Sequence, residues 1–484
     1  MDVTRFTHPI DLHAVSITDP FWQRETELVR REVIPYQWDA LNDRIPGAEK
    51  SWCMHNFRLA GRIMAQARQQ GAQYTPQAYT YRGYNALPDD PAHPDEDKFY
   101  GFLFQDTDFS KWIEAVGYSL ILHPDEALEA TADEAIDVVC AAQTPEGYLD
   151  TYYIINGMDG VFQNLRDHHE LYCLGHLIEG AVSYYQATGK DKLLRAACRF
   201  ADYVADFFGT ADGQCKGYPG HEIAEMALVR LYEVTQDEKY LRLSRFFINE
   251  RGQEPNYFVE EERRNAEREH RPVRSVNLAY HQAVKPVREQ DEAIGHAVRA
   301  VYLYSGMADV ARMTGDDSLK SACERLWRSI VQEKLYITGG IGATQIGEAF
   351  SYAYDLPNDT CYTETCAAIG LAMWALRMLK LNPDSSYADV MERALYNNVL
   401  SGISEDGEHY FYVNPLMLKP DVARYRRDHE SVEPERVKWF GCACCPPNVI
   451  RTLCGLGGYV YTQREDAVYQ HLYLGNSASF RTSK

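Results

Sequence analysis

The sequence lacks several features that define whole classes of protein. No apolar run approaches the roughly 18 residues of a membrane-spanning helix, and the start, MDVTRFTHPIDLHAVSITDPFW, lacks the basic-then-apolar order of a secretory signal peptide. Basic residues are few relative to acidic ones, with 49 Lys+Arg against 70 Asp+Glu and a net charge of −21. This balance disfavours nucleic acid and anionic membranes as partners. We therefore expect a cytoplasmic protein that binds neither.

Two common ligand motifs are also missing. The glycine-rich stretch TGGIGATQIG lacks the lysine of a GxxxxGK[ST] phosphate loop. The 12 cysteines lack the two separate CxxC pairs of a four-cysteine zinc finger. In a reducing compartment most of them should be free thiols. Five lie in helix-like apolar patterns and are expected to be small buried hydrophobes: Cys140, Cys173, Cys198, Cys323 and Cys454.

What the sequence does contain is a series of helix pairs. Each first helix is apolar on all sides, as a buried inner helix should be, and each second helix carries more charge. Such hairpins build either an open solenoid or a closed toroid. Because the repeats are irregular and separated by long polar loops, we predict a mainly α protein with an (α/α)6 toroid. The pairs span 108–143, 169–209, 220–252, 295–336 and 364–402, and a sixth opens after Pro446-Pro447.

The two ends of the chain differ from its middle. Residues 10–18 and 467–480 alternate in the manner of β-strands, although few partners for them are visible. The sequence therefore predicts three parts: an extended segment (1–19), the toroid (20–464) and the start of a β region (465–484).

Histidines stand near the starts of three of the predicted inner helices. They are His169, His221 and His296. Inner helices of a toroid run in the same direction, so their N-termini gather at one rim. A single histidine at a helix start is most often a cap or a surface residue, but three at equivalent positions favour a ligand pocket at that rim.

A cluster of sulfur lies in KWFGCACCPPN, residues 438–448, which holds Cys442, Cys444 and Cys445. A disulfide within it would be strained, which leaves a metal or a reactive thiolate. Together with Glu364 and Cys366, the Cys444–Cys445 pair would supply one carboxylate and three thiolates, a set that zinc accepts. From spacing alone, a metal site and a purely structural role for these cysteines are equally favoured. An iron–sulfur cluster is disfavoured because it usually needs four cysteines.

A second carboxylate, Glu348, precedes Glu364 by a glycine-rich loop. It could act as a general acid and then a base if a low-dielectric site raised its pKa. The alternative, an exposed loop glutamate, is equally favoured by the residues alone.

These stretches resemble glycoside hydrolase family 127, the β-L-arabinofuranosidase type. The combination of GEAF, ETC and CCPPN is specific, and the matching segments run in order from about residue 20 to 460. They include HHELYCLGHLIEGA, GYPGHEIAEMALVRLYEVT, AIGHAVRAVYLYSGMADV, TGGIGATQIGEAFSYAYDLPNDTCYTETCAAIG, MERALYNNVLSGIS, YFYVNPL and CCPPNVIRTL.

The resemblance implies an (α/α)6 catalytic domain with appended β domains and a retaining hydrolase. In this mechanism a zinc-bound Cys444 thiolate is the nucleophile and Glu348 is the general acid/base. The implied zinc ligands are Glu364, Cys366, Cys444 and Cys445. The implied sugar-binding residues are His169, His221, His296, Glu392, Tyr412 and Gln37. The implied substrate is a small oligosaccharide or glycoside.

Two departures from the family pattern matter. Cys442 is an extra thiol beside the ligand set, and the chain stops at Lys484 where family members continue into β-sandwich domains, so we expect a truncated form. The alternatives are another furanosidase, a sugar epimerase or an unsaturated-uronide hydrolase on the same toroid, and a non-catalytic, zinc-containing carbohydrate-binding protein. The exact sugar, the linkage and the assembly state, a homodimer among the options, stay open.

Overall fold

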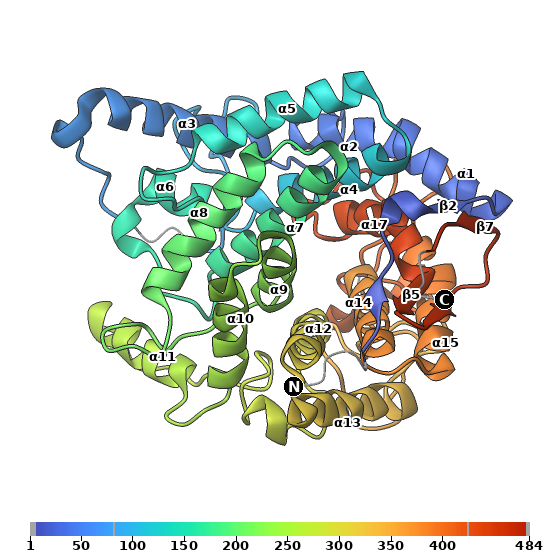
Figure 1. Ribbon diagram of the computed structural model, residues 1–484. Helices are drawn as coiled ribbons and strands as arrows, with labels where there is room; N and C mark the ends of the chain where they lie inside the picture. Colours follow the sequence, from blue (N-terminus) through green and yellow to red (C-terminus); the bar gives the residue numbers. More distant parts are fainter. Residues whose placement is uncertain (1–5, 81–82, 424, 481–484) are drawn as a thin grey trace.

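Six inner helices form a closed ring in the computed structural model, which describes residues 6–80, 83–423 and 425–480. Successive inner helices pack against each other in chain order, and the last packs against the first. Figure 1 shows the ring nearly end-on, with α9, α12 and α14 around its centre. The inner helices are α4 (Asp106–Leu122), α7 (Glu170–Thr188), α9 (Ala224–Thr235), α12 (Ala297–Thr314), α14 (Thr365–Leu381) and α17 (Cys445–Cys454).

An outer layer of helices surrounds the ring. Five inner helices are each followed by an outer partner: α5 (Glu126–Ala141), α8 (Lys192–Phe207), α10 (Glu238–Glu250), α13 (Asp317–Glu333) and α15 (Ser385–Ala394). The sixth, α17, packs against the start of the chain, where α1 (Pro20–Leu28), a π-helical turn (Val29–Val33) and α2 (Ile34–Leu41) form one long helix. The predicted (α/α)6 toroid is confirmed, and the first outer helix closes the last pair.

The remaining helices lie outside the ring or between its hairpins. They are α3 (Cys53–Gln70), α6 (Thr151–Asn156), α11 (Tyr257–Arg268) and α16 (Pro420–Ala423). None of the helices that the structure describes is both long enough and apolar enough to cross a membrane.

The two chain ends pair with each other through short antiparallel strands. One sheet has the order β1 (His8–Pro9), β5 (Tyr461–Arg464) and β6 (Ala467–Gln470), and β2 (Val15–Ile17) pairs with β7 (Asn476–Ala478). A hairpin of β3 (Asn85–Ala86) and β4 (Gly101–Phe102) lies apart from them. Each end thus supplies the strand partners that the sequence did not reveal. The proposed domain limits stay a prediction, and residues 1–5 and 481–484 lie outside the described part.

Glycine allows a close approach between the inner helices α4 and α7. A Cβ atom at Gly117 of α4 would lie 2.4 Å from the Ser183 Oγ and 2.7 Å from the Ser183 carbonyl carbon on α7. No side-chain rotation can relieve a clash with backbone, so any larger residue must push the two helices apart.

We expect Gly117→Ala to destabilise the protein by about 1–3 kcal/mol, because overpacking forces the backbone to shift. Gly61→Ala is the matched control, since its Cβ would meet Ala141 Cβ at an ordinary 3.6 Å. Alanine is the better helix former, so this control should be neutral or stabilising. The measurement is the shift in Tm, and equal shifts for both variants would contradict the packing argument.

Candidate metal centre and active site

The N-termini of the inner helices gather around one cavity of about 410 Å³. His169, His296, Glu364 and Cys444 are the residues that immediately precede α7, α12, α14 and α17. His221 lies just before α9 and also lines the cavity. The parallel direction of the inner helices therefore explains why polar residues far apart in sequence share one site.

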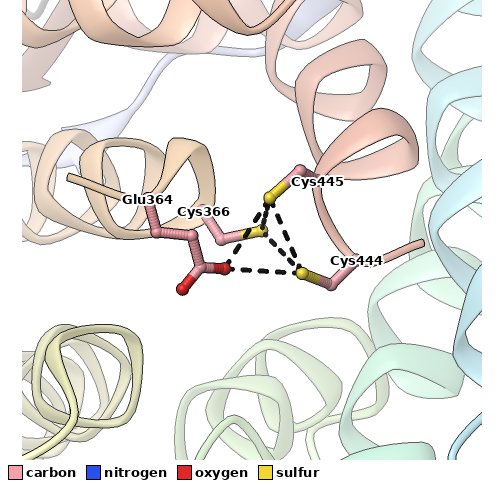
Figure 2. A group of neighbouring side chains, drawn as sticks. All are labelled: Glu364, Cys366, Cys444 and Cys445. Atoms are coloured by element: carbon pink, nitrogen blue, oxygen red, sulfur yellow. Dashed lines mark hydrogen bonds between the residues drawn. The ribbon is translucent and has the colours of Figure 1, made fainter. Parts of the chain in front are cut away.

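Four potential metal ligands meet at one side of this cavity. The Cys366 Sγ lies 3.4 Å from the Cys444 Sγ and 3.3 Å from the Cys445 Sγ. The two vicinal sulfur atoms are 3.7 Å apart, and Glu364 Oε1 lies 3.4 Å from Cys444 Sγ and 3.7 Å from Cys445 Sγ. Figure 2 shows the four side chains converging from the starts of α14 and α17. All four donor atoms lie within 4.8 Å of one another.

The donor set fits a tetrahedral metal ion. Thiolate bonds of about 2.3 Å would separate the sulfur atoms of a tetrahedral site by about 3.8 Å, close to the observed spacing. Burial and the neighbouring Cys444 raise the pKa of Glu364 well above its usual value, and in the described chain its buried Oε2 has no hydrogen-bond partner. Crowding acidic groups in this way without a cation is costly, whereas a bound cation would neutralise them.

Local backbone structure brings these ligands together. Thr365 donates its N–H to the carbonyl of Tyr412 at 3.0 Å, and Glu364 forms a β-bridge with Val413. Thr363, just before the first ligand, has a φ of 38°, a conformation that non-glycine residues rarely adopt. On the other side, Cys445 occupies the first turn of α17 together with two prolines, which suit that position.

Cys444 is the more accessible of the two vicinal thiols. Cys445 is 1% exposed, whereas Cys444 is half-buried and lines the cavity. The Cys444 Sγ lies 2.9 Å from the Tyr412 Oη. The extra thiol, Cys442, also lines the cavity and lies 3.9 Å from the same phenol oxygen. In the described part of the chain, Cys442 is not a member of the four-residue metal group.

Glu348 reaches the same cavity from a tight loop. Its φ is 51°, so the loop holds it in a strained conformation. Its Oε2 lies 2.9 Å from the His296 Nε2. The His296 Nδ1 accepts the N–H of Val298 at 3.1 Å. The ring proton must therefore be on Nε2, from which it is donated to the Glu348 carboxylate.

The pKa of Glu348 lies below its usual value. Burial raises the pKa, but the hydrogen bond from His296, the charge of Arg299 and a hydrogen bond from Tyr362 outweigh it. The condition that the sequence analysis set for an acid role, a raised pKa, is therefore not met in the free protein, and the carboxyl is ionised there. His296 and Arg299, which lie at the start of α12, and Tyr362, which lies in a loop, cause this lowering.

His169 and His221 present acceptor nitrogens to the cavity. The His169 Nδ1 lies 2.9 Å from the Asp167 carbonyl, and the His221 Nδ1 lies 3.0 Å from the Glu222 carbonyl. Each Nδ1 must donate its proton there, which leaves Nε2 as an acceptor. Burial and then the charge of Arg299 lower the pKa of both rings well below the usual value, so both are neutral.

Two residues of the predicted sugar-binding set lie away from the cavity. Glu392 is exposed on the outer helix α15 and does not line the cavity. Gln37 is buried in α2, where its Nε2 donates to the Tyr410 Oη at 3.1 Å. The structure thus does not support direct sugar contacts at either position, because both belong to the outer layer rather than to the helix starts.

The structure also places residues at the cavity that sequence reasoning missed. Arg299 and Tyr172 each lie one helical turn beyond a predicted histidine, so helical spacing could have found them. Tyr84 and Phe102 belong to the segment between α3 and α4, whose sequence gives no signal of a shared site. Tyr84 places its Oη 3.5 Å from the His169 Nε2.

Comparisons with known proteins give a consistent result. Residues 14–458 match the model of a family described as "Beta-L-arabinofuranosidase, GH127 catalytic domain". A curated relative from Bifidobacterium longum subsp. longum, a non-reducing end β-L-arabinofuranosidase, is 40% identical over 475 residues, which are 96% of this chain and 69% of the relative.

Two solved structures of GH127 enzymes are also similar to this chain. A GH127 β-L-arabinofuranosidase from Geobacillus stearothermophilus T6 is 48% identical with a TM-score of 0.85, and the match covers 96% of this chain and 68% of the other. A second GH127 β-arabinofuranosidase is 40% identical with a TM-score of 0.81, and the match covers 99% and 66% of the two chains.

Proposed function

The chain belongs to glycoside hydrolase family 127 and is a glycosidase of the β-L-arabinofuranosidase type, and we propose that Cys444 is its nucleophile and Glu348 its general acid/base. The observation that carries this proposal is the position of the Cys444 thiol, which belongs to the metal-ligand group and also faces the cavity that holds Glu348.

The histidines and Tyr412 bind the terminal sugar in this proposal. The Nε2 atoms of His169 and His221 accept hydrogen bonds from sugar hydroxyls, and the His296 Nε2–H donates a hydrogen bond to another. When a sugar hydroxyl accepts the hydrogen bond from His296, Glu348 loses the main hydrogen bond that holds its pKa down. Glu348 can then hold the proton that the first step needs.

In the first step, the Cys444 thiolate attacks the anomeric carbon while Glu348 transfers its proton to the departing oxygen. The S–C bond forms as the C–O bond breaks, which leaves a thioglycosyl-enzyme and an ionised Glu348. In the second step, Glu348 takes a proton from water, whose oxygen displaces the sulfur. Two displacements return the original anomeric configuration.

Glu364, Cys366, Cys444 and Cys445 would hold a zinc ion. When bound, zinc keeps its cysteine ligands deprotonated and fixes their direction. Tyr412, whose Oη lies 2.9 Å from Cys444 Sγ, limits where that thiolate can point.

The decisive experiment compares an aryl β-L-arabinofuranoside with its α anomer, with and without a chelator. We expect release from the β anomer only, loss of that release when the chelator removes the metal, and recovery when zinc is returned. Metal analysis should give one zinc per chain. Release from neither anomer by the zinc-loaded protein would instead favour the non-catalytic, carbohydrate-binding alternative.

A further inference from the structure

A buried network of polar side chains adjoins the metal-ligand group. It begins at Asn448, which follows the ligand Cys445 by three residues on α17 and is fully buried. The Asn448 amide forms a hydrogen bond with the Cys366 thiol. Its Nδ2 also donates to the Tyr302 Oη at 3.1 Å. Because Asn448 does not line the catalytic cavity, it can influence the reaction only through the residues that it contacts.

Arg451 determines which way the Asn448 amide faces. It lies about one turn further along α17, and its Nε donates to the Asn448 Oδ1 at 2.5 Å. An arginine side chain carries only donors, so the atom that faces it must be the amide oxygen. The NH₂ group of Asn448 is therefore turned to the other side, where it donates one hydrogen to the Tyr302 Oη and the other to the Cys366 sulfur.

Arg451 is itself held at both of its terminal nitrogen atoms. Its Nη1 pairs with the Glu114 Oε2 at 2.9 Å, and its Nη2 donates to the Tyr302 Oη at 3.1 Å. Glu114 lies on α4 and Tyr302 on α12, and all three side chains are buried. The network thus connects three inner helices to Cys366 on a fourth, α14. A planar guanidinium with these partners has one orientation, and it passes that orientation on to the amide.

We propose that Asn448 is a positioning residue of the metal centre, whose amide, oriented by Arg451 and Tyr302, holds the Cys366 sulfur in the direction that the metal ion needs. The inference rests on the proposed metal centre. Asn448 acts through Cys366 and touches neither the sugar nor the reacting atoms. A hydrogen-bond partner of a metal ligand fixes the orientation of that ligand, and its loss typically lowers metal affinity by about 10- to 100-fold.

The test measures metal binding in Asn448→Asp, which keeps the shape of the side chain but replaces the NH₂ group with an oxygen. Zinc affinity, measured by competition with a chromophoric chelator, should fall by about 10- to 100-fold. In the cobalt(II)-substituted protein, the thiolate-to-cobalt charge-transfer band should shift, because one sulfur ligand has lost its donor. Tyr302→Phe removes only the hydroxyl that aligns the amide, so zinc affinity should fall less, by about threefold to tenfold.

Thr452→Val is the matched control. Thr452 is a buried polar residue one turn after Asn448, and its Oγ1 donates to the Asn448 main-chain carbonyl at 2.9 Å. Valine keeps its shape, so this variant should bind zinc and cobalt as the wild type does.

A purely structural network would give a different result. The variants would then have a lower Tm, but their zinc affinity and cobalt spectrum would match those of the wild type. That outcome would overturn the positioning role and leave the proposed function standing. If Asn448→Asp does not fold, unchanged zinc affinity in Tyr302→Phe overturns the inference in the same way. A wild-type protein that binds neither zinc nor cobalt would refute the metal centre itself, and this inference with it.

Discussion

Replacing Cys444 by alanine is expected to lower turnover of an aryl β-L-arabinofuranoside by about 10⁴-fold or more, since no other group replaces a lost nucleophile. The toroid should survive, because Cys444 is half-buried at a helix start rather than in the core. Three of the four metal ligands also remain, so zinc should still bind. Turnover, zinc content and the circular-dichroism spectrum of the same preparation check all three expectations.

The matched control for this variant is Cys442→Ala. Cys442 lines the same cavity two residues away but is not part of the four-residue metal group. We expect this variant to keep activity within about tenfold of the wild type. Full activity in Cys444→Ala, or loss of activity in Cys442→Ala alone, would exclude Cys444 as the nucleophile.

Replacing Glu348 by glutamine should separate the two steps of the reaction. For an alkyl glycoside, kcat/KM should fall by about 10²–10⁴-fold, the usual contribution of a general acid. An aryl glycoside with a good leaving group needs little protonation, so its first step should be nearly normal. Its second step should slow, because no base activates water, and a burst of aryl alcohol should precede slow turnover.

The pH dependence provides a second readout for Glu348. Because the first step needs the protonated carboxyl, kcat/KM for the alkyl glycoside should fall as pH rises through the pKa of Glu348 in the free protein. That decline should be missing in Glu348→Gln. Glu392→Gln should match the wild type in every assay, since Glu392 is exposed on the outer layer. If Glu348→Gln shows no burst of aryl alcohol and keeps the pH profile of the wild type, Glu348 is excluded as the acid/base.

Much of the fold could be predicted because the inner helices carry a strong pattern. They are apolar on all sides, and the residues just before four of them, His169, His296, Glu364 and Cys444, are those that converge. Because the inner helices run in the same direction, their starts meet at one rim, and the pattern therefore predicts a site there.

The parts that could not be predicted depend on irregular segments. Tyr84 reaches His169 from the long connection between α3 and α4, where no periodicity fixes a position. The lowered pKa of Glu348 depends on which His296 nitrogen carries the proton, and that in turn depends on a hydrogen bond at the start of α12. Glu392 lies in a segment that resembles the family, but a sequence match does not say which face of a helix meets the cavity.

The most direct test of the account is to identify the atom that carries the sugar between the two steps. Glu348→Gln, incubated with an activated aryl β-L-arabinofuranoside, should accumulate the glycosylated protein, because the first step is fast and the second is slow. Peptide mass spectrometry should then find one pentosyl group on Cys444. A pentosyl group on any other residue, or continued turnover with unmodified Cys444 throughout, would contradict the mechanism.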